Sequence, residues 1–154
     1  MVETARGKPD LHTVKRESEN QKEQYETPNK ILGMDLVNME KFQVKGYKYL
    51  LNAIDMSSRF LYSVALKNKT DAEVLNGFKK IFNKSKIRAV RSDNGSEFIN
   101  KKFTDYLETN DIKQILSEAS KPQRNGMIER ANATIKELIQ KSIEMIDKFD
   151  WVKF

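Results

Sequence analysis

Three acidic residues occupy positions from which they could hold metal ions for phosphoryl chemistry. Asp35 interrupts an apolar stretch at residues 34–37, where an unpartnered carboxylate would be costly to bury. Asp93 follows another apolar stretch, at the Asp93-Asn94-Gly95 sequence, and Glu129 comes soon after Gly126. Mg²⁺ prefers carboxylate, water and phosphate oxygens as ligands. Side chains at strand ends are held in place and still reach solvent, so these acids are candidate ligands.

Each acid also has an ordinary structural explanation. Asp35 could occupy an edge position of a short strand. Asp93 could belong to a plain turn, because Asn and Gly tolerate positive φ. Glu129 could simply be an acidic residue in the first turn of a helix, where its charge interacts favourably with the helix dipole. The prediction of a metal site therefore depends on the three acids taken together.

The elements that must position these acids follow from the apolar pattern. Alternating and continuous apolar runs predict strands over residues 31–38, 47–55, 60–66, 87–92 and 112–117. A capping box at Thr70 and Glu73 predicts a helix to about residue 82, and Ser96 is the candidate N-cap of a helix to about Thr109. Residues 128–146 have the spacing of a long amphipathic helix. Three strands joined by short turns, followed by alternating helices and strands, predict an α/β fold with a mixed five-stranded sheet flanked by helices.

Composition narrows the range of functions. The 154 residues suit one domain, with 38% hydrophobic and 32% charged residues and a net charge of +6 that favours polyanionic partners. The chain has no cysteine, and its only histidine is His12, which excludes a thiolate metal site, a cysteine nucleophile and a multi-histidine site. It contains neither an apolar run of the ~18 residues that a membrane helix needs nor an apolar N-terminal signal. We therefore expect an intracellular, non-secreted protein without a membrane partner.

Residues 1–30 differ from the rest of the chain. They hold six Lys or Arg and six Asp or Glu but very few apolar residues. Such a stretch cannot bury enough apolar surface to offset the entropy of ordering it. We predict a flexible charged leader over residues 1–30 and one folded domain over residues 31–154.

Five motifs follow one another along the chain: MDLVNM at 34–39, GYKYLLNAID at 46–55, SRF at 58–60, SDNGSEF at 92–98 and PQRNGMIER at 122–130. Between Asp93 and Glu129 lie 35 residues. In this order the motifs resemble the catalytic core of retroviral integrases and of related retroelement and DNA-transposon integrases, and the gap matches the D,D-35-E spacing of that family. The resemblance covers about residues 31–145, and parts of the first two motifs are similar to Polinton/Maverick integrases.

The resemblance implies an RNase H-like fold in which Asp35, Asp93 and Glu129 are the catalytic residues and the ligands of two Mg²⁺ ions, with Mn²⁺ as a substitute. It implies DNA 3′-end processing and strand transfer for a retroelement, DNA transposon or virus. The implied partners are the element ends, target DNA and further copies of the chain, in the nucleus of a eukaryotic host. The candidate DNA-binding residues are Lys136, Asn125, Lys121, Arg124 and Arg130.

The sequence also departs from the family pattern. A His/His/Cys/Cys zinc module cannot form from one histidine and no cysteine, and we expect no C-terminal DNA-binding domain because the sequence stops at Phe154. Ala133 stands where retroviral members can carry a second lysine. Two alternatives remain open at this stage. One is another RNase H-like nuclease, for instance one that acts on RNA–DNA hybrids, and the other is a catalytically inactive DNA-binding remnant of an integrase.

Overall fold

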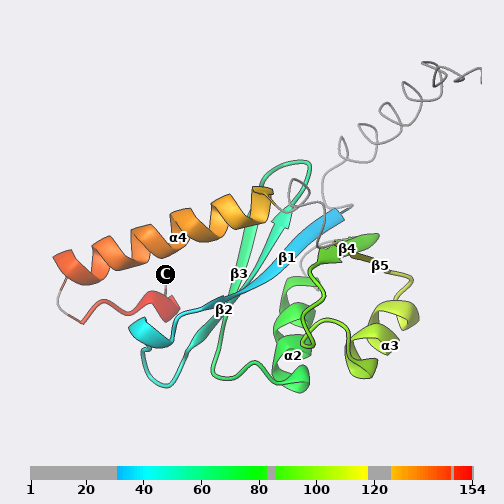
Figure 1. Cartoon of the computed structure of the whole chain (residues 1–154), viewed down its shortest axis with the longest axis horizontal. Coiled ribbons are helices and arrows are strands. Elements are labelled where there is room, and N and C mark those ends of the chain that lie inside the picture. The colour runs from blue at the N-terminus through cyan, green and yellow to red at the C-terminus, as the bar shows by residue number, and fades with distance from the viewer. Residues whose placement is uncertain (1–30, 83–85, 118–125, 147, 154) are drawn as a thin grey trace, which may run out of the picture.

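The structure is a computed structural model that describes residues 31–82, 86–117, 126–146 and 148–153, so the predicted leader lies outside the described residues. A central sheet carries helices on both of its faces (Figure 1). The strands are β1 (Ile31–Asn38), β2 (Tyr49–Asp55), β3 (Leu61–Leu66), β4 (Ala89–Ser92) and β5 (Lys113–Leu116). The helices are α2 (Asp71–Phe82), α3 (Lys101–Thr109) and α4 (Gly126–Met145), with short 3-10 helices at Glu40–Phe42 and Trp151–Lys153.

The sheet has the mixed topology that the sequence predicts. Its five strands lie in the order β3-β2-β1-β4-β5. Strands β1, β2 and β3 are antiparallel neighbours, whereas β4 is parallel to β1 and β5 is parallel to β4. Short turns can join only antiparallel neighbours, and a parallel return needs a crossover such as the one that α2 supplies. The order of elements in the sequence therefore dictates where the sheet changes direction.

Alternation along the strands divides the core between the two faces of the sheet. Leu32 and Met34 face α2 and α3, where Phe78, Phe98 and Phe103 are fully buried. The opposite face lies under α4, which covers it in Figure 1 and packs on it through Ile128 and Ile139. Asp35 belongs to this second face because side chains alternate along β1.

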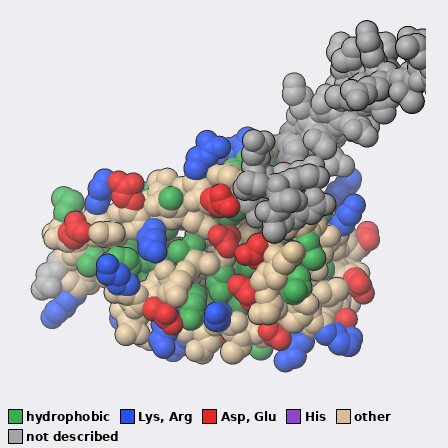
Figure 2. Space-filling model, viewed as in Figure 1, with side chains coloured by type: hydrophobic (Ala, Val, Ile, Leu, Met, Phe, Trp, Pro, Cys, Tyr) green, Lys and Arg blue, Asp and Glu red, His purple; other side chains and the backbone are tan. Residues whose placement is uncertain are grey.

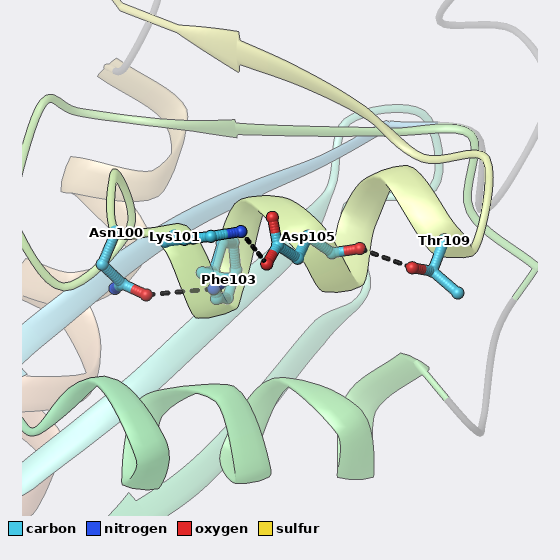
Figure 3. A network of polar contacts seen from close by, with 5 residues as sticks. All are labelled: Asn100, Lys101, Phe103, Asp105 and Thr109. Atoms are coloured by element: carbon cyan, nitrogen blue, oxygen red, sulfur yellow. Dashed lines mark hydrogen bonds and ion pairs between the residues drawn. The ribbon is translucent and has the colours of Figure 1, made fainter.

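The predicted start of the second helix is wrong. Helix α3 begins at Lys101 rather than near Ser96, and its N-cap is Asn100, whose Oδ1 accepts a hydrogen bond of 3.0 Å from the Phe103 amide (Figure 3). Residues 96–98 form a turn in which the Phe98 amide donates to the Gly95 carbonyl. The turn places Phe98 fully in the core, and that burial decides the helix boundary.

The predicted capping box at the start of α2 forms only in part. Thr70 Oγ1 accepts a hydrogen bond of 3.4 Å from the Glu73 amide, as a capping box requires. The Glu73 carboxylate, however, accepts hydrogen bonds from the amides of Lys67 and Asn68 at 2.5 and 3.0 Å. The Glu73 side chain therefore satisfies backbone N–H groups of the loop that precedes α2. No helix in the described parts of the chain has the length and apolar content needed to cross a membrane.

Replacing Asn100 by Ala should destabilise the protein without touching the acidic residues. The substitution removes the hydrogen bond that Asn100 Oδ1 accepts from the Phe103 amide, drawn in Figure 3, and losing an N-cap of this kind costs about 1 kcal/mol. Urea denaturation should show a lower midpoint with an unchanged slope. An unchanged midpoint would mean that Asn100 does not cap α3 in solution.

Candidate active site

Asp35 lies in the middle of β1 with both carboxylate oxygens engaged. Its Oδ1 accepts a hydrogen bond of 2.8 Å from the Leu36 amide, and its Oδ2 accepts one of 2.6 Å from Asn132 Nδ2. The side chain is only half-buried, so it remains in reach of solvent. A carboxylate inside an apolar strand is thus held between its own backbone and helix α4.

Asp93 immediately follows β4 and lies level with Asp35 across the sheet. The parallel register pairs Gly33 of β1 with Arg91 of β4. Asp35 comes two residues after Gly33, and Asp93 comes two residues after Arg91. Asp93 Oδ1 accepts a hydrogen bond of 2.9 Å from the Gly95 amide, which makes a tight turn after the strand. A Cβ on Gly95 would lie 2.8 Å from the Glu97 carboxyl group and 3.0 Å from Asp93 Oδ1. Glycine therefore allows this turn to bring the Glu97 carboxyl group close to Asp93.

Glu129 is exposed in the first turn of α4. The neighbouring Ile128 is buried against the sheet, so the start of the helix is anchored beside β1. Figure 2 shows acidic side chains gathered near the N-terminal end of α4. Three elements that are far apart in sequence therefore bring the three candidate acids to one region of the molecule.

The electrostatics of Asp35 reflect this arrangement. Burial raises the pKa of the Asp35 carboxyl group, and the negative charges of Asp93 and Glu129 raise it further. The hydrogen bonds from Leu36 and Asn132 lower the pKa but do not cancel the increase. The ionised form of Asp35 is therefore disfavoured in the folded protein when no cation is bound.

In a buffer without divalent cations, this raised pKa predicts a specific pH dependence of stability. The folded state binds the Asp35 proton more tightly than the unfolded state, so the contribution of Asp35 is fully present below its ordinary pKa and is lost as pH rises through the folded-state pKa. Wild type should therefore lose Tm relative to Asp35→Asn as pH rises from 4 to 7. Thermal denaturation of both proteins across this range tests the prediction. A constant difference in Tm would show that Asp35 titrates normally.

The described residues contain no group of three His, Cys, Asp or Glu side chains that is compact enough to hold a metal ion. The acids are close enough for their charges to interact, but they do not converge on one point. Their chemistry nevertheless fits Mg²⁺, because all three offer carboxylate oxygens and their mutual repulsion is the kind that a dication relieves. The assignment of Asp35, Asp93 and Glu129 as metal ligands and catalytic residues stays a prediction.

The candidate DNA-binding residues are only partly described. Lys136 and Arg130 are exposed on α4, two turns after Glu129 and next to it, respectively. Arg130 also lines a hollow together with Arg59, at the same end of the helix. The other three candidates lie outside the described residues: Lys121, Arg124 and Asn125.

Asn132 was not among the residues predicted from the sequence, although the sequence holds signals for it. Asn132 stands three residues after Glu129, which places both on neighbouring positions of one helix face. A related signal is Asn52, a polar residue inside the apolar run 50–54 that is fully buried in the structure. Asn52 resembles Asp35 in this respect, because a polar group inside an apolar run needs a partner.

Comparison with known proteins agrees with this architecture. The family model described as "Integrase core domain" matches residues 26–122, a range that includes Asp35 and Asp93 and ends before Glu129. The Retrovirus-related Pol polyprotein from transposon TNT 1-94 of Nicotiana tabacum is 32% identical over 111 residues, which cover 70% of this chain and 8% of that protein. The Gag-Pro-Pol polyprotein of Mason-Pfizer monkey virus is 30% identical over 125 residues, which cover 80% of this chain and 7% of that protein.

Two solved structures resemble the fold. One is the simian T-cell lymphotropic virus intasome in complex with PP2A regulatory subunit B56 gamma, with a TM-score of 0.72 and 20% identity over 81% of this chain and 45% of the matched chain. The other is the HTLV-2 integrase catalytic core domain in complex with magnesium, in a dimeric form, with a TM-score of 0.66 and 24% identity over 80% of this chain and 78% of that one.

This chain therefore belongs to the integrase core domain family. Its mixed sheet with helices on both faces is the RNase H-like fold of integrase catalytic cores. The chain spans less than a tenth of the length of the curated relatives described above. The comparisons thus concern one domain of much longer proteins.

Proposed function

We propose that this chain is the catalytic core of a DNA integrase, which carries out metal-dependent DNA 3′-end processing and strand transfer. The observation that carries the proposal is the meeting of Asp35, Asp93 and Glu129 at one region of an integrase-core fold, close enough for two of the acids to raise the pKa of the third. Such electrostatic coupling among carboxylates is typical of sites that bind cations. The magnesium in the HTLV-2 core structure supports the choice of ion.

The roles of the three acids are those that the family resemblance implies. Asp35, whose carboxyl group is affected by the charges of both Asp93 and Glu129, would contact both of two Mg²⁺ ions, while each of the other acids would hold one. Bound Mg²⁺ would activate the attacking oxygen and stabilise the charge that develops on the phosphate and the leaving oxygen. A water molecule first displaces a DNA 3′-oxygen from phosphorus, and the resulting 3′-hydroxyl then displaces a 3′-oxygen of target DNA. Each step makes one phosphorus–oxygen bond and breaks one, so no covalent enzyme intermediate is needed.

The basic residues around α4 would bind the DNA phosphates. Arg59 and Arg130 line a hollow beside the start of α4, and Lys136 is exposed further along the helix. Their charge complements DNA, and the element ends and target DNA are the partners we propose. The dimeric HTLV-2 core supports a homo-oligomer as the working form. In a eukaryotic host the substrate DNA would place this reaction in the nucleus.

Lys136→Glu should weaken DNA binding with little change in Tm, because the side chain is exposed. Loss of one phosphate contact lowers the salt dependence of the logarithm of the binding constant by about one. Fluorescence anisotropy with a DNA duplex at several salt concentrations measures this change. Lys102→Glu is the matched control, since it makes the same charge change at an exposed position of α3. An equal loss of DNA affinity in both variants would mean that Lys136 contributes only to the overall charge and does not contact the DNA specifically.

A disintegration assay tests the proposed reaction. It supplies a branched DNA substrate with Mg²⁺ or Mn²⁺ and measures resolution of the branch by transesterification. We expect resolution of this substrate and no cleavage of a length-matched RNA–DNA hybrid. Preferential cleavage of the hybrid would favour a different RNase H-like nuclease. DNA binding without either reaction, and without any metal dependence, would favour the inactive remnant.

A further inference from the structure

Three polar residues form a row across the face of the sheet that α4 covers. The register pairs Asp35 of β1 with Asn52 of β2, and Asn52 with Ser63 of β3. The neighbours of Asn52 on this face of β2 are the apolar Leu50 and Ile54, which are buried under α4. The row is therefore a polar strip within an otherwise apolar contact between sheet and helix.

Asn132 of α4 closes this strip into a continuous chain of hydrogen bonds. Ser63 Oγ donates to Asn52 Oδ1 at 2.6 Å, and Asn52 Nδ2 donates to Asn132 Oδ1 at 2.7 Å. Asn132 Nδ2 then donates to Asp35 Oδ2 at 2.6 Å. Four side chains from four elements are thus linked end to end, and Asn52, at the centre, is fully buried.

The direction of this chain is set at Asp35, where both carboxyl oxygens accept hydrogen bonds: Oδ1 accepts from the Leu36 amide and Oδ2 accepts from Asn132 Nδ2. Asn132 must therefore turn its amide nitrogen to Asp35 and its oxygen to Asn52. Asn52 must in turn donate its nitrogen and leave its oxygen for the Ser63 hydroxyl. Each amide has one oxygen and one nitrogen to use, so every member of the chain fixes the orientation of the next.

We propose that Asn52 and Ser63 are positioning residues that orient the Asp35 carboxylate through Asn132. The inference concerns the site of the proposed function and rests on it for the role of Asp35. Asn132 is one helical turn after Glu129, so the same chain also ties the start of α4 to β1. Asn52 and Ser63 therefore hold two of the candidate acids in a fixed relation before any cation binds.

The first test reads the orientation of Asn132 in protein without divalent cations. Side-chain amide ¹H–¹⁵N spectra of wild type should show a slowly exchanging Asn132 amide group. Asn52→Leu removes the polar partner at similar volume, and Ser63→Ala removes the hydroxyl group. Both should shift the Asn132 signals and speed their exchange. Ser63→Thr keeps the hydroxyl at an exposed strand position and should leave the signals in place.

The second test reads the affinity for Mg²⁺ through the concentration that produces half of the increase in Tm. Loss of a residue that orients a metal ligand typically lowers affinity about tenfold or more, which we expect for Asn52→Leu. Ser63→Ala loses one hydrogen bond further from Asp35 and should cost about threefold. Ser63→Thr should match wild type. Asn100→Ala is the control for instability, because it should lower Tm and leave the Mg²⁺ midpoint unchanged.

The two readouts separate failure of this proposal from failure of the proposed function. If Asn52→Leu and Ser63→Ala lower Tm but leave the Asn132 signals and the Mg²⁺ midpoint unchanged, the two residues are only structural and the proposal is overturned. If Mg²⁺ has no effect on wild type, the proposed metal site fails, and the amide spectra still decide whether Asn52 and Ser63 orient Asn132. Shifted Asn132 signals together with raised Mg²⁺ midpoints would support both the positioning role of Asn52 and Ser63 and the proposed metal site.

Discussion

Replacing Asp93 by Asn should lower the rate of disintegration by about a thousandfold. The variant keeps an oxygen that can accept the hydrogen bond from the Gly95 amide, so the turn after β4 should persist. It removes one of the charges that would hold a cation. Metal ions supply several kcal/mol of transition-state stabilisation, and roughly 1.4 kcal/mol corresponds to a tenfold change in rate. Initial rates on the branched substrate, with Mg²⁺ at saturation for each protein, measure the loss.

Asp105→Asn is the matched control for this variant. It makes the same chemical change on α3, where the Asp105 carboxylate is exposed and pairs with Lys101 at 2.7 Å (Figure 3). Because α3 lies on the face of the sheet opposite to α4, the control should retain the wild-type rate. Wild-type activity in Asp93→Asn would remove Asp93 from the catalytic residues and would leave the D,D-35-E spacing without a chemical role in this chain.

Mg²⁺ should raise the Tm of wild type and should fail to do so in the Asp35→Asn, Asp93→Asn double variant. A ligand that binds only the folded state stabilises it, and a concentration a hundredfold above the dissociation constant adds about 2.7 kcal/mol. For a domain of this size that corresponds to an increase on the order of 10 °C. Metal binding requires ionised carboxylates, so the increase should be largest at neutral pH and should fade in acid.

Measurement of Tm against Mg²⁺ concentration, repeated with Ca²⁺ and with sodium chloride at matched ionic strength, distinguishes a specific site from general screening. The raised pKa of Asp35 predicts that the double variant starts from a higher Tm than wild type without cations at pH 7. Mg²⁺ should therefore narrow or reverse that difference. An equal increase in both proteins would exclude a site shared by Asp35 and Asp93.

The local pattern of the sequence was enough for the secondary structure that surrounds the candidate site. Strand β1 was predicted with its observed bounds, Ile31–Asn38, because the run is apolar and bounded by polar residues. Asp35 was recognisable because a carboxylate within such a run needs a partner. The order of the elements predicted the mixed sheet, since short turns can make only antiparallel pairs.

Helix starts were less predictable, because several polar side chains near each start can serve as caps. Ser96 and Asn100 are both acceptable N-caps by residue type. Asn100 is the N-cap of α3 because Phe98 is buried in the core. This burial is a tertiary contact, which the local sequence does not reveal. Glu73 likewise binds Lys67 and Asn68 because the preceding loop presents its amides there.

The sequence by itself determined the fold class through its apolar pattern, and its motifs and their spacing carried the resemblance to the family and pointed out the three candidate acids. Only the tertiary structure decided how Asp35 is held. Its partner Asn132 is 97 residues away, and Asn132 in turn binds Asn52 at a separation of 80 residues. Such pairings depend on strand register and on where α4 crosses the sheet. Neither is set by local propensity, because both result from packing apolar side chains between the helix and the sheet.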